Sequence, residues 1–201
     1  MGRFIQAIAE GDGISIVPLL EGDIAELAAL AEEAGAEAVA VRTAGEVASA
    51  RSQTALPVLV REPRLELSEA PDADAYTVSL DGLAEEGVLE GVYAVLRDQE
   101  IDCVVEVRDD EQLEEALERI DPEIILISER RADQDWEELE RTLDLLPDVP
   151  AGKLVISEAE IGSREQVVAL ERAGVDAILV GGDFLRHSPD FASALAELTG
   201  R

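Results

Sequence analysis

Short apolar runs alternate with helical patterns along the whole chain, an arrangement typical of βαβ units with a parallel sheet. Eight runs rich in Val, Ile, Leu and Ala have the length of strands that are buried on both faces. They span Ile14–Val17, Ala38–Val41, Pro57–Val60, Ala75–Val78, Asp102–Val107, Ile124–Ile127, Lys153–Ile156 and Ala177–Val180. Eight is the strand number of a (β/α)8 barrel, so the pattern predicts this fold.

Most segments between the runs carry apolar residues at three- and four-residue spacing, as amphipathic helices do. DIAELAALAEEAG, DEQLEEALERI and SREQVVALERAG are the clearest, each with a capping Asp or Ser near its start. Two units are shorter: the second has only AGEVASARSQT, and the third has REPRLELSEAPDAD with two prolines. We therefore predict a (β/α)8 TIM barrel with shortened second and third helical units. A doubly wound open sheet is the alternative.

The length of 201 residues suits one well-buried domain. We expect residues 1–201 to form a single barrel, with 1–12 as a short N-terminal helix or lead-in. Aromatic residues make up only 3% of the chain, so its core must be built from aliphatic side chains.

The formal net charge of −30 at pH 7 argues against polyanionic partners, because phosphate backbones are bound through Lys and Arg. Nucleic acid and anionic membranes are therefore not expected as partners. The carboxylates are spread along the chain, and Lys153 is its only lysine. This distribution indicates adaptation to high salt, which screens repulsion between carboxylates. An acidic protein from a GC-rich mesophile is the alternative.

Cys103 is the only cysteine, which excludes an internal disulfide and a thiolate metal site, and we expect it to be buried. No apolar run has the length of a signal peptide or approaches the ~20 residues of a membrane span. These features predict a cytoplasmic protein.

Candidate site residues stand where the predicted strands end, because ligands of such barrels bind at the carboxyl ends of the strands. They are Pro18, Arg42, Arg61, Ser79, Glu106, Arg108, Ser128, Arg130, Glu158, Gly181 and Gly182.

Several segments resemble, in order and spacing, signature segments of indole-3-glycerol phosphate synthase. They are LPVLVREP, VVEVRDDEQLEEAL, IILISERRAD and GKLVISEAEIGSREQVVALERAGVDAILVGGDFLR. The resemblance implies a (β/α)8 enzyme of tryptophan biosynthesis. That family closes the indole ring of a carboxyphenylamino-deoxyribulose phosphate, with loss of carbon dioxide and water, and needs no cofactor or metal. Its members normally have a longer N-terminal helical extension than this chain.

The resemblance also implies roles for individual residues. Glu106 and Glu158 match catalytic carboxylates of the family. Substrate binding is implied for Arg61, Ser128, Arg130, Gly181 and Gly182, of which the two glycines lie at a phosphate loop. A sugar phosphate or another small molecule is therefore the expected ligand at the barrel mouth.

The chain departs from the family pattern where lysines are expected. Arg61 matches the catalytic lysine of the third strand, and an arginine cannot give up its proton at neutral pH. Ile16 and Pro18 stand where the first strand of the family carries Glu and Lys. Glu160 replaces a glycine beside the phosphate, and a carboxylate there repels a dianion.

Two functions therefore stay open. The chain is either an enzyme of tryptophan biosynthesis with an incomplete catalytic set, or a binding or interaction module that has lost the reaction. In the second case Arg61, Arg108 and Arg130 would neutralise Glu106 and Glu158 in a structural salt-bridge network across the mouth.

Overall fold

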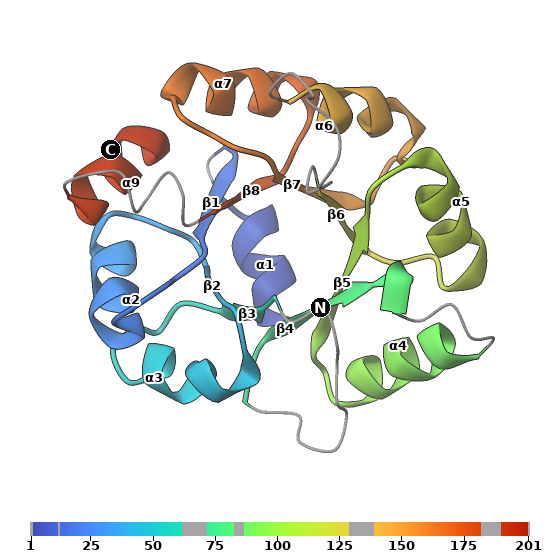
Figure 1. Ribbon diagram of the computed structural model, residues 1–201, viewed down its shortest axis with the longest axis horizontal. Helices are drawn as coiled ribbons and strands as arrows, with labels where there is room; N and C mark the ends of the chain where they lie inside the picture. Colours follow the sequence, from blue (N-terminus) through green and yellow to red (C-terminus); the bar gives the residue numbers. More distant parts are fainter. Residues whose placement is uncertain are drawn as a thin grey trace.

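The eight expected strands form one sheet that closes into a barrel. The computed structural model describes residues 2–11, 13–61, 72–82, 87–128, 139–181 and 190–200. Its strands are β1 (Ser15–Pro18), β2 (Val39–Val41), β3 (Val58–Val60), β4 (Ala75–Ser79), β5 (Asp102–Val107), β6 (Ile124–Ser128), β7 (Leu154–Glu158) and β8 (Ala177–Val180). Figure 1 shows them as a ring surrounded by helices.

From β2 to β8 each strand pairs in parallel with the next one in sequence, and β8 also pairs in parallel with β1. The last gap, between β1 and β2, is joined by a parallel bridge from Leu19 to Ala40 and by a 2.8 Å hydrogen bond from Leu20 N to Ala40 O. The predicted (β/α)8 barrel is thus confirmed, and the open-sheet alternative is wrong.

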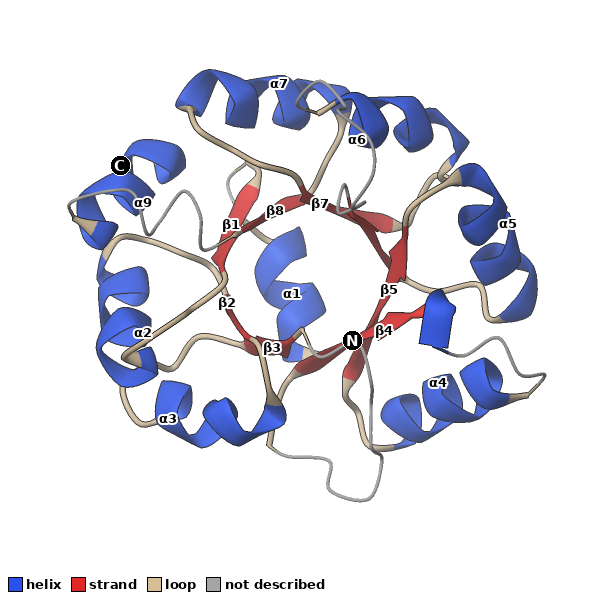
Figure 2. Ribbon diagram, viewed as in Figure 1, coloured by secondary structure: helices blue, strands red, loops and turns tan. Residues whose placement is uncertain are grey.

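Apart from the N-terminal helix described below, the helices lie outside the strands (Figure 2). They are α2 (Ile24–Glu33), α3 (Val47–Arg51), α4 (Val88–Asp98), α5 (Asp110–Arg119), α6 (Glu140–Leu145), α7 (Arg164–Ala173) and α9 (Phe191–Thr199), with short 3-10 turns η1 (Ala44–Glu46), η3 (Leu80–Gly82) and η4 (Leu146–Asp148). The second unit is short, as predicted, because η1 and α3 together span only Ala44 to Arg51. The segment expected to be short in the third unit, 62–71, lies outside the described residues.

Side-chain caps fix where several helices begin. Asp23, Asp109, Ser163 and Asp190 accept hydrogen bonds from backbone N–H groups in the first turns of α2, α5, α7 and α9. These caps satisfy N–H groups that have no partner within the helix. Asp23 and Ser163 are caps that the sequence pattern indicated, whereas the cap of α5 is Asp109 and not the expected Asp110.

The barrel interior is filled from its amino-terminal end by α1 (Arg3–Ala9), which lies inside the ring in Figure 1. Phe4, Ile5 and Ile8 belong to the same buried cluster as the inward-facing strand residues. The carboxylate of Asp102, at the start of β5, accepts hydrogen bonds from Phe4 N and Ile5 N at 3.1 and 3.0 Å. The opposite end, where the strands finish, is left for the polar residues described below.

The helices and the outer faces of the strands form a second aliphatic layer, and Cys103 is buried in it as expected. Burial raises the pKa of the Cys103 thiol to about 12, so the side chain is a neutral apolar group. In the described part of the chain, no helix has the length and apolar character needed to span a bilayer.

Candidate functional site

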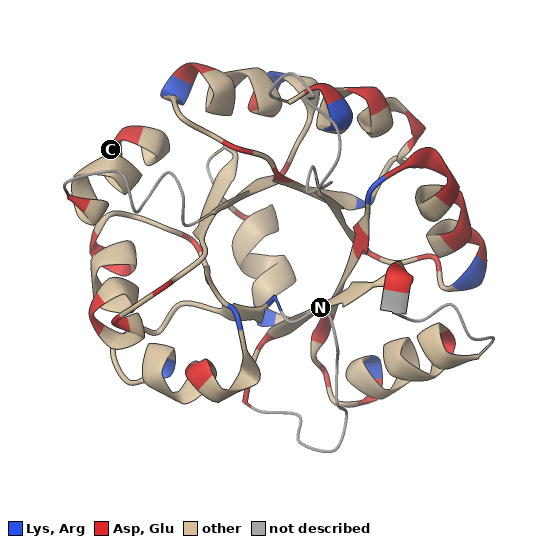
Figure 3. Cartoon of the chain, viewed as in Figure 1, with Lys and Arg blue, Asp and Glu red and all other residues tan. Residues whose placement is uncertain are grey.

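Strand alternation brings charged residues together at the carboxyl end of the barrel. Inward-facing positions of β5, β6 and β7 are aliphatic in the middle of the barrel and become Glu106, Ser128 and Glu158 near the end. Arg61 directly follows β3. The strand register places Ser128 beside Glu158 and Ser79 beside Glu106. Figure 3 shows this contrast, with most acidic residues on the outer helices and few charges on the strands.

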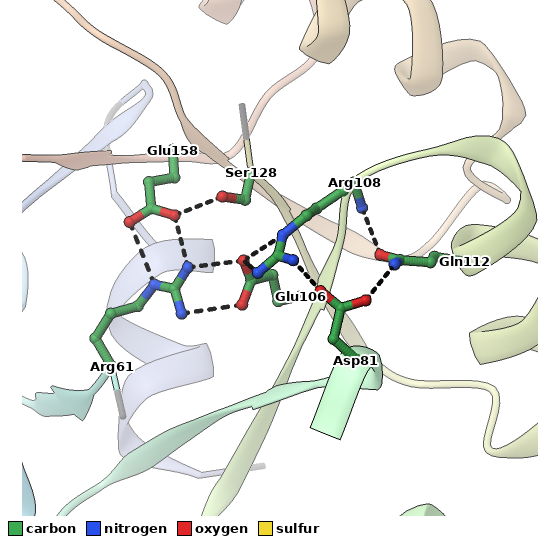
Figure 4. Close-up of polar contacts among 7 residues, drawn as sticks. All are labelled: Arg61, Asp81, Glu106, Arg108, Gln112, Ser128 and Glu158. Carbon is green, nitrogen blue, oxygen red and sulfur yellow. Dashed lines mark hydrogen bonds and ion pairs between the residues drawn. The ribbon is translucent and has the colours of Figure 1, made fainter. Parts of the chain in front are cut away.

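Arg61 lies between the two glutamates that the sequence singled out (Figure 4). Its Nε and Nη2 donate to the two carboxylate oxygens of Glu158 at 3.3 and 2.7 Å. Its Nη1 donates to Glu106 Oε2 at 3.1 Å, and its Nη2 lies 3.0 Å from Glu106 Oε1. The three residues are 7%, 7% and 1% exposed, in the order Arg61, Glu158 and Glu106. The guanidinium of Arg61 is therefore hydrogen-bonded to the buried carboxylates of both Glu106 and Glu158.

The second arginine extends this network toward the solvent. Arg108 donates from Nε and Nη2 to Glu106 Oε1 at 3.2 and 3.0 Å. Its Nη1 forms an ion pair with Asp81, which also accepts a hydrogen bond from Gln112 Nε2 at 2.9 Å. At the inner end, Ser128 Oγ donates to Glu158 Oε2 at 2.8 Å. The contacts thus run without a break from Ser128 to Gln112.

The ion pairs of this network stabilise the charged forms of Arg61 and Glu106. Burial alone would lower the pKa of Arg61, but the carboxylates of Glu158 and Glu106 outweigh it and raise that pKa above its ordinary value. Burial alone would raise the pKa of Glu106, but Arg61 and Arg108 outweigh it and hold that pKa below its ordinary value. Glu106 is therefore an ionised hydrogen-bond acceptor at neutral pH and is poorly suited to donate a proton.

The structure shows which residues of the first strand face the barrel interior. Ile16 packs in the outer layer between the sheet and the helices, whereas Val17 and Leu19 face the barrel interior. Pro18 is on the same face of β1 as Ile16, because strand residues alternate. The inward-facing side chains of this segment are therefore those of Val17 and Leu19. Both are apolar, so β1 still supplies no acid and no lysine to the mouth.

The only lysine of the sequence lies far from the mouth, as expected. Lys153 precedes β7 at the amino-terminal end of the barrel, and its Nζ is 2.5 Å from Asp121 Oδ1. Gly181 follows β8 at the carboxyl end, whereas Gly182 and Arg130 lie outside the described residues. Glu160, in the loop between β7 and α7, is exposed.

Asp81 and Gln112 belong to the network but were not among the residues expected from the sequence. Asp81 is in the 3-10 turn η3 directly after β4, and Gln112 is in the first turn of α5. Their positions after two neighbouring strands are the only signal that the sequence offers. Among the described residues, no group of three His, Cys, Asp or Glu side chains is arranged to hold a metal ion.

Comparison with known proteins identifies relatives of this barrel. Indole-3-glycerol phosphate synthase of a Geobacillus strain is 31% identical over 179 residues, which cover 83% of this chain and 69% of that protein. The enzyme of Acidithiobacillus ferrooxidans is 34% identical over 145 residues, covering 70% of this chain and 54% of the enzyme. The chain thus spans about half to two thirds of the length of these relatives.

A solved structure of 3-hexulose-6-phosphate synthase superposes with a TM-score of 0.75 and 15% identity, covering 93% of this chain and 99% of that one. At this identity the likeness shows the barrel fold alone. A model of the family described as indole-3-glycerol phosphate synthase matches residues 18–198, which is nearly the whole sequence. On this match and on the identity to the curated relatives, the chain belongs to the indole-3-glycerol phosphate synthase family.

Proposed function

We propose that this chain is an indole-3-glycerol phosphate synthase-like barrel, derived from tryptophan biosynthesis, whose ring-closing activity is strongly reduced or lost. The observation that carries this proposal is the position of Arg61, which pairs with both Glu106 and Glu158 inside the barrel mouth. The two carboxylates that would handle protons are engaged in buried ion pairs. The barrel would then keep its fold while its mouth serves as a structural salt-bridge network.

The chemistry of Arg61 supports the loss of activity. The family resemblance implies a lysine at this position, and a lysine can act as a general acid when its pKa is lowered by burial. A guanidinium stays protonated at any physiological pH, and the paired carboxylates make its proton still harder to remove. If residual activity exists, it is of the carbon–carbon carboxy-lyase type and needs no cofactor.

The second candidate function is a binding or interaction module without catalysis. It is favoured by the completeness of the network, since Arg61 and Glu106 already satisfy one another and no longer offer free groups to a reaction. The expected ligand is a sugar phosphate or another small molecule at the mouth. Glu160 would weaken binding of a phosphate dianion if its carboxylate lies beside the phosphate loop. The cytoplasm is the expected compartment, and nucleic acid is not an expected partner.

A steady-state assay of indole-3-glycerol phosphate formation by the purified protein tests this proposal. The same protein, expressed in a tryptophan auxotroph that lacks its own synthase, tests it in cells. We expect negligible turnover and no growth without tryptophan, and growth at the rate of a complemented control strain would contradict the proposal.

The acidic composition leads to a separate prediction about salt. We propose that the excess of carboxylates is an adaptation to a saline cytoplasm, in which a short Debye length screens their mutual repulsion. The melting temperature should rise as KCl increases from ~0.1 M toward several molar, as followed by circular dichroism. A melting temperature that stays flat or falls over this range would favour an acidic protein from a GC-rich mesophile.

A further inference from the structure

At the outer end of the network, the carboxylate of Asp81 accepts hydrogen bonds from two side chains, Arg108 and Gln112 (Figure 4). Arg108 Nη1 pairs with Asp81 Oδ2, and Gln112 Nε2 donates to Asp81 Oδ1 at 2.9 Å. Each oxygen of the Asp81 carboxylate thus has a donor of its own, one cationic and one neutral. Both donors come from the start of the unit after β5, whereas Asp81 comes from the turn after β4.

The two donors are held in place by contacts that do not involve Asp81. Arg108 Nε and Nη2 both donate to the buried Glu106 carboxylate. The backbone N–H of Arg108 donates to Gln112 Oε1 at 3.0 Å, which turns the amide NH2 of Gln112 toward Asp81. The backbone carbonyl of Arg108 also accepts a hydrogen bond from Arg141 Nη1. Arg108 and Gln112 are therefore held in place by contacts other than those with Asp81.

The inner and outer carboxylates differ in how easily they can leave. The side chain of Glu106 is 1% exposed, and separating it from its arginines would leave a buried charge unpaired. The side chain of Asp81 is 52% exposed, so on leaving Arg108 it regains its hydration. Exposed ion pairs of this kind contribute little to stability. Asp81 is consequently the member of the network that another anion can replace.

We propose that Arg108 and Gln112 form a binding site for the carboxylate of a small ligand at the barrel mouth, and that Asp81 occupies this site in the unliganded protein. The inference deepens the second candidate function, on which it rests for the view that the mouth binds small molecules. A carboxylate matches the site because it is planar, singly charged and offers two oxygens to the two donors. A phosphate dianion would place a further negative charge near Glu106, which is unfavourable.

Titration calorimetry with acetate, at matched high ionic strength in KCl, tests the proposal. Asp81→Asn removes the charged group that competes with acetate, and it should tighten acetate binding by up to about fivefold, because an exposed ion pair contributes about 0–1 kcal/mol. Adding Arg108→Gln to that variant should abolish the binding. Asp121→Asn is the matched control, because it removes the same charge from an ion pair at the opposite end of the barrel and should change nothing.

Three results would overturn the proposal: acetate binding by Asp81→Asn no tighter than that of the wild type, equal gains in Asp81→Asn and Asp121→Asn, or an equal gain for inorganic phosphate. If Asp81→Asn does not fold, acetate should still shift the side-chain NMR signals of Gln112 and Arg108 in the wild-type protein, and unmoved signals would count against the site. Because acetate binding is measured without turnover, an active synthase would refute the proposed function and leave this test intact.

Discussion

The purified protein is expected to form indole-3-glycerol phosphate at least about 10²- to 10⁴-fold more slowly than a complete synthase, the range associated with losing a general acid. The physical reason is the pairing of Arg61 with Glu106 and Glu158. Arg61 cannot release a proton, and Glu106 is held ionised by two guanidinium groups. Val17 and Leu19 supply no charged group from the first strand to take over either role.

The assay should be run at ~0.1 M and at several molar KCl, so that a salt requirement for folding is not mistaken for inactivity. Arg61→Lys is the informative variant, since it keeps the positive charge and restores a titratable amine. It should remain well below a complete synthase, because the first strand still lacks its acid and its lysine. Wild-type turnover within tenfold of an ordinary family member would contradict the account.

Replacing Arg61 with leucine should destabilise the fold by about 3–5 kcal/mol, the usual result of removing one partner from a buried ion pair. The substitution would leave the carboxylates of Glu106 and Glu158 buried without the arginine that joins them. Denaturant unfolding at pH 7 in several molar KCl measures this difference directly.

Arg42→Leu is the matched control for that experiment. It makes the same change in charge and side chain at the end of the neighbouring strand, where Arg42 pairs with Glu21 and its side chain is 49% exposed. An exposed pair of this kind should contribute only about 0–1 kcal/mol. An Arg61→Leu protein that is no less stable than Arg42→Leu would show that the buried network does not hold the mouth together. Combining Arg61→Leu with Glu106→Gln and Glu158→Gln should recover much of the loss.

The strands could be predicted closely because each is an aliphatic run bounded by turn residues. The expected run Asp102–Val107 is β5 itself, and Pro57–Val60 differs from β3 by one residue. The closed barrel was predicted because the sequence contains eight strand-like runs. The third unit was expected to be short from its prolines, but its connecting segment lies outside the described residues.

The face of a strand was harder to predict than its position. All four residues of β1 are buried, since one face packs inside the barrel and the other against the helices. A strand buried on both faces reads as a continuous apolar run and gives no alternation from which to read its orientation. The sequence alone therefore could not show that Ile16 faces the helices and Val17 the barrel interior.

Because ligands of such barrels bind at the carboxyl ends of the strands, the sequence predicted one candidate site containing Arg61, Glu106, Ser128 and Glu158. The structure places these four residues in contact. The positions of these residues in the sequence do not show that Arg61 pairs with Glu158, because the two are 97 residues apart and meet only across the closed barrel. Asp81 and Gln112 were missed for a related reason: each is an ordinary polar residue in a turn or a helix start until the barrel places it beside Arg108.

The central claim is that Arg61 and Arg108 hold Glu106 as a permanent anion in a structural network. A carbon-detected NMR titration of the Glu106 side-chain carboxyl tests it most directly, with Glu106→Gln used to assign the signal. We expect the Glu106 carboxyl to titrate with a midpoint below the ordinary value for a glutamate, because Arg61 and Arg108 hold its pKa down. A midpoint between about pH 6 and 7, as expected of a general acid, would contradict it.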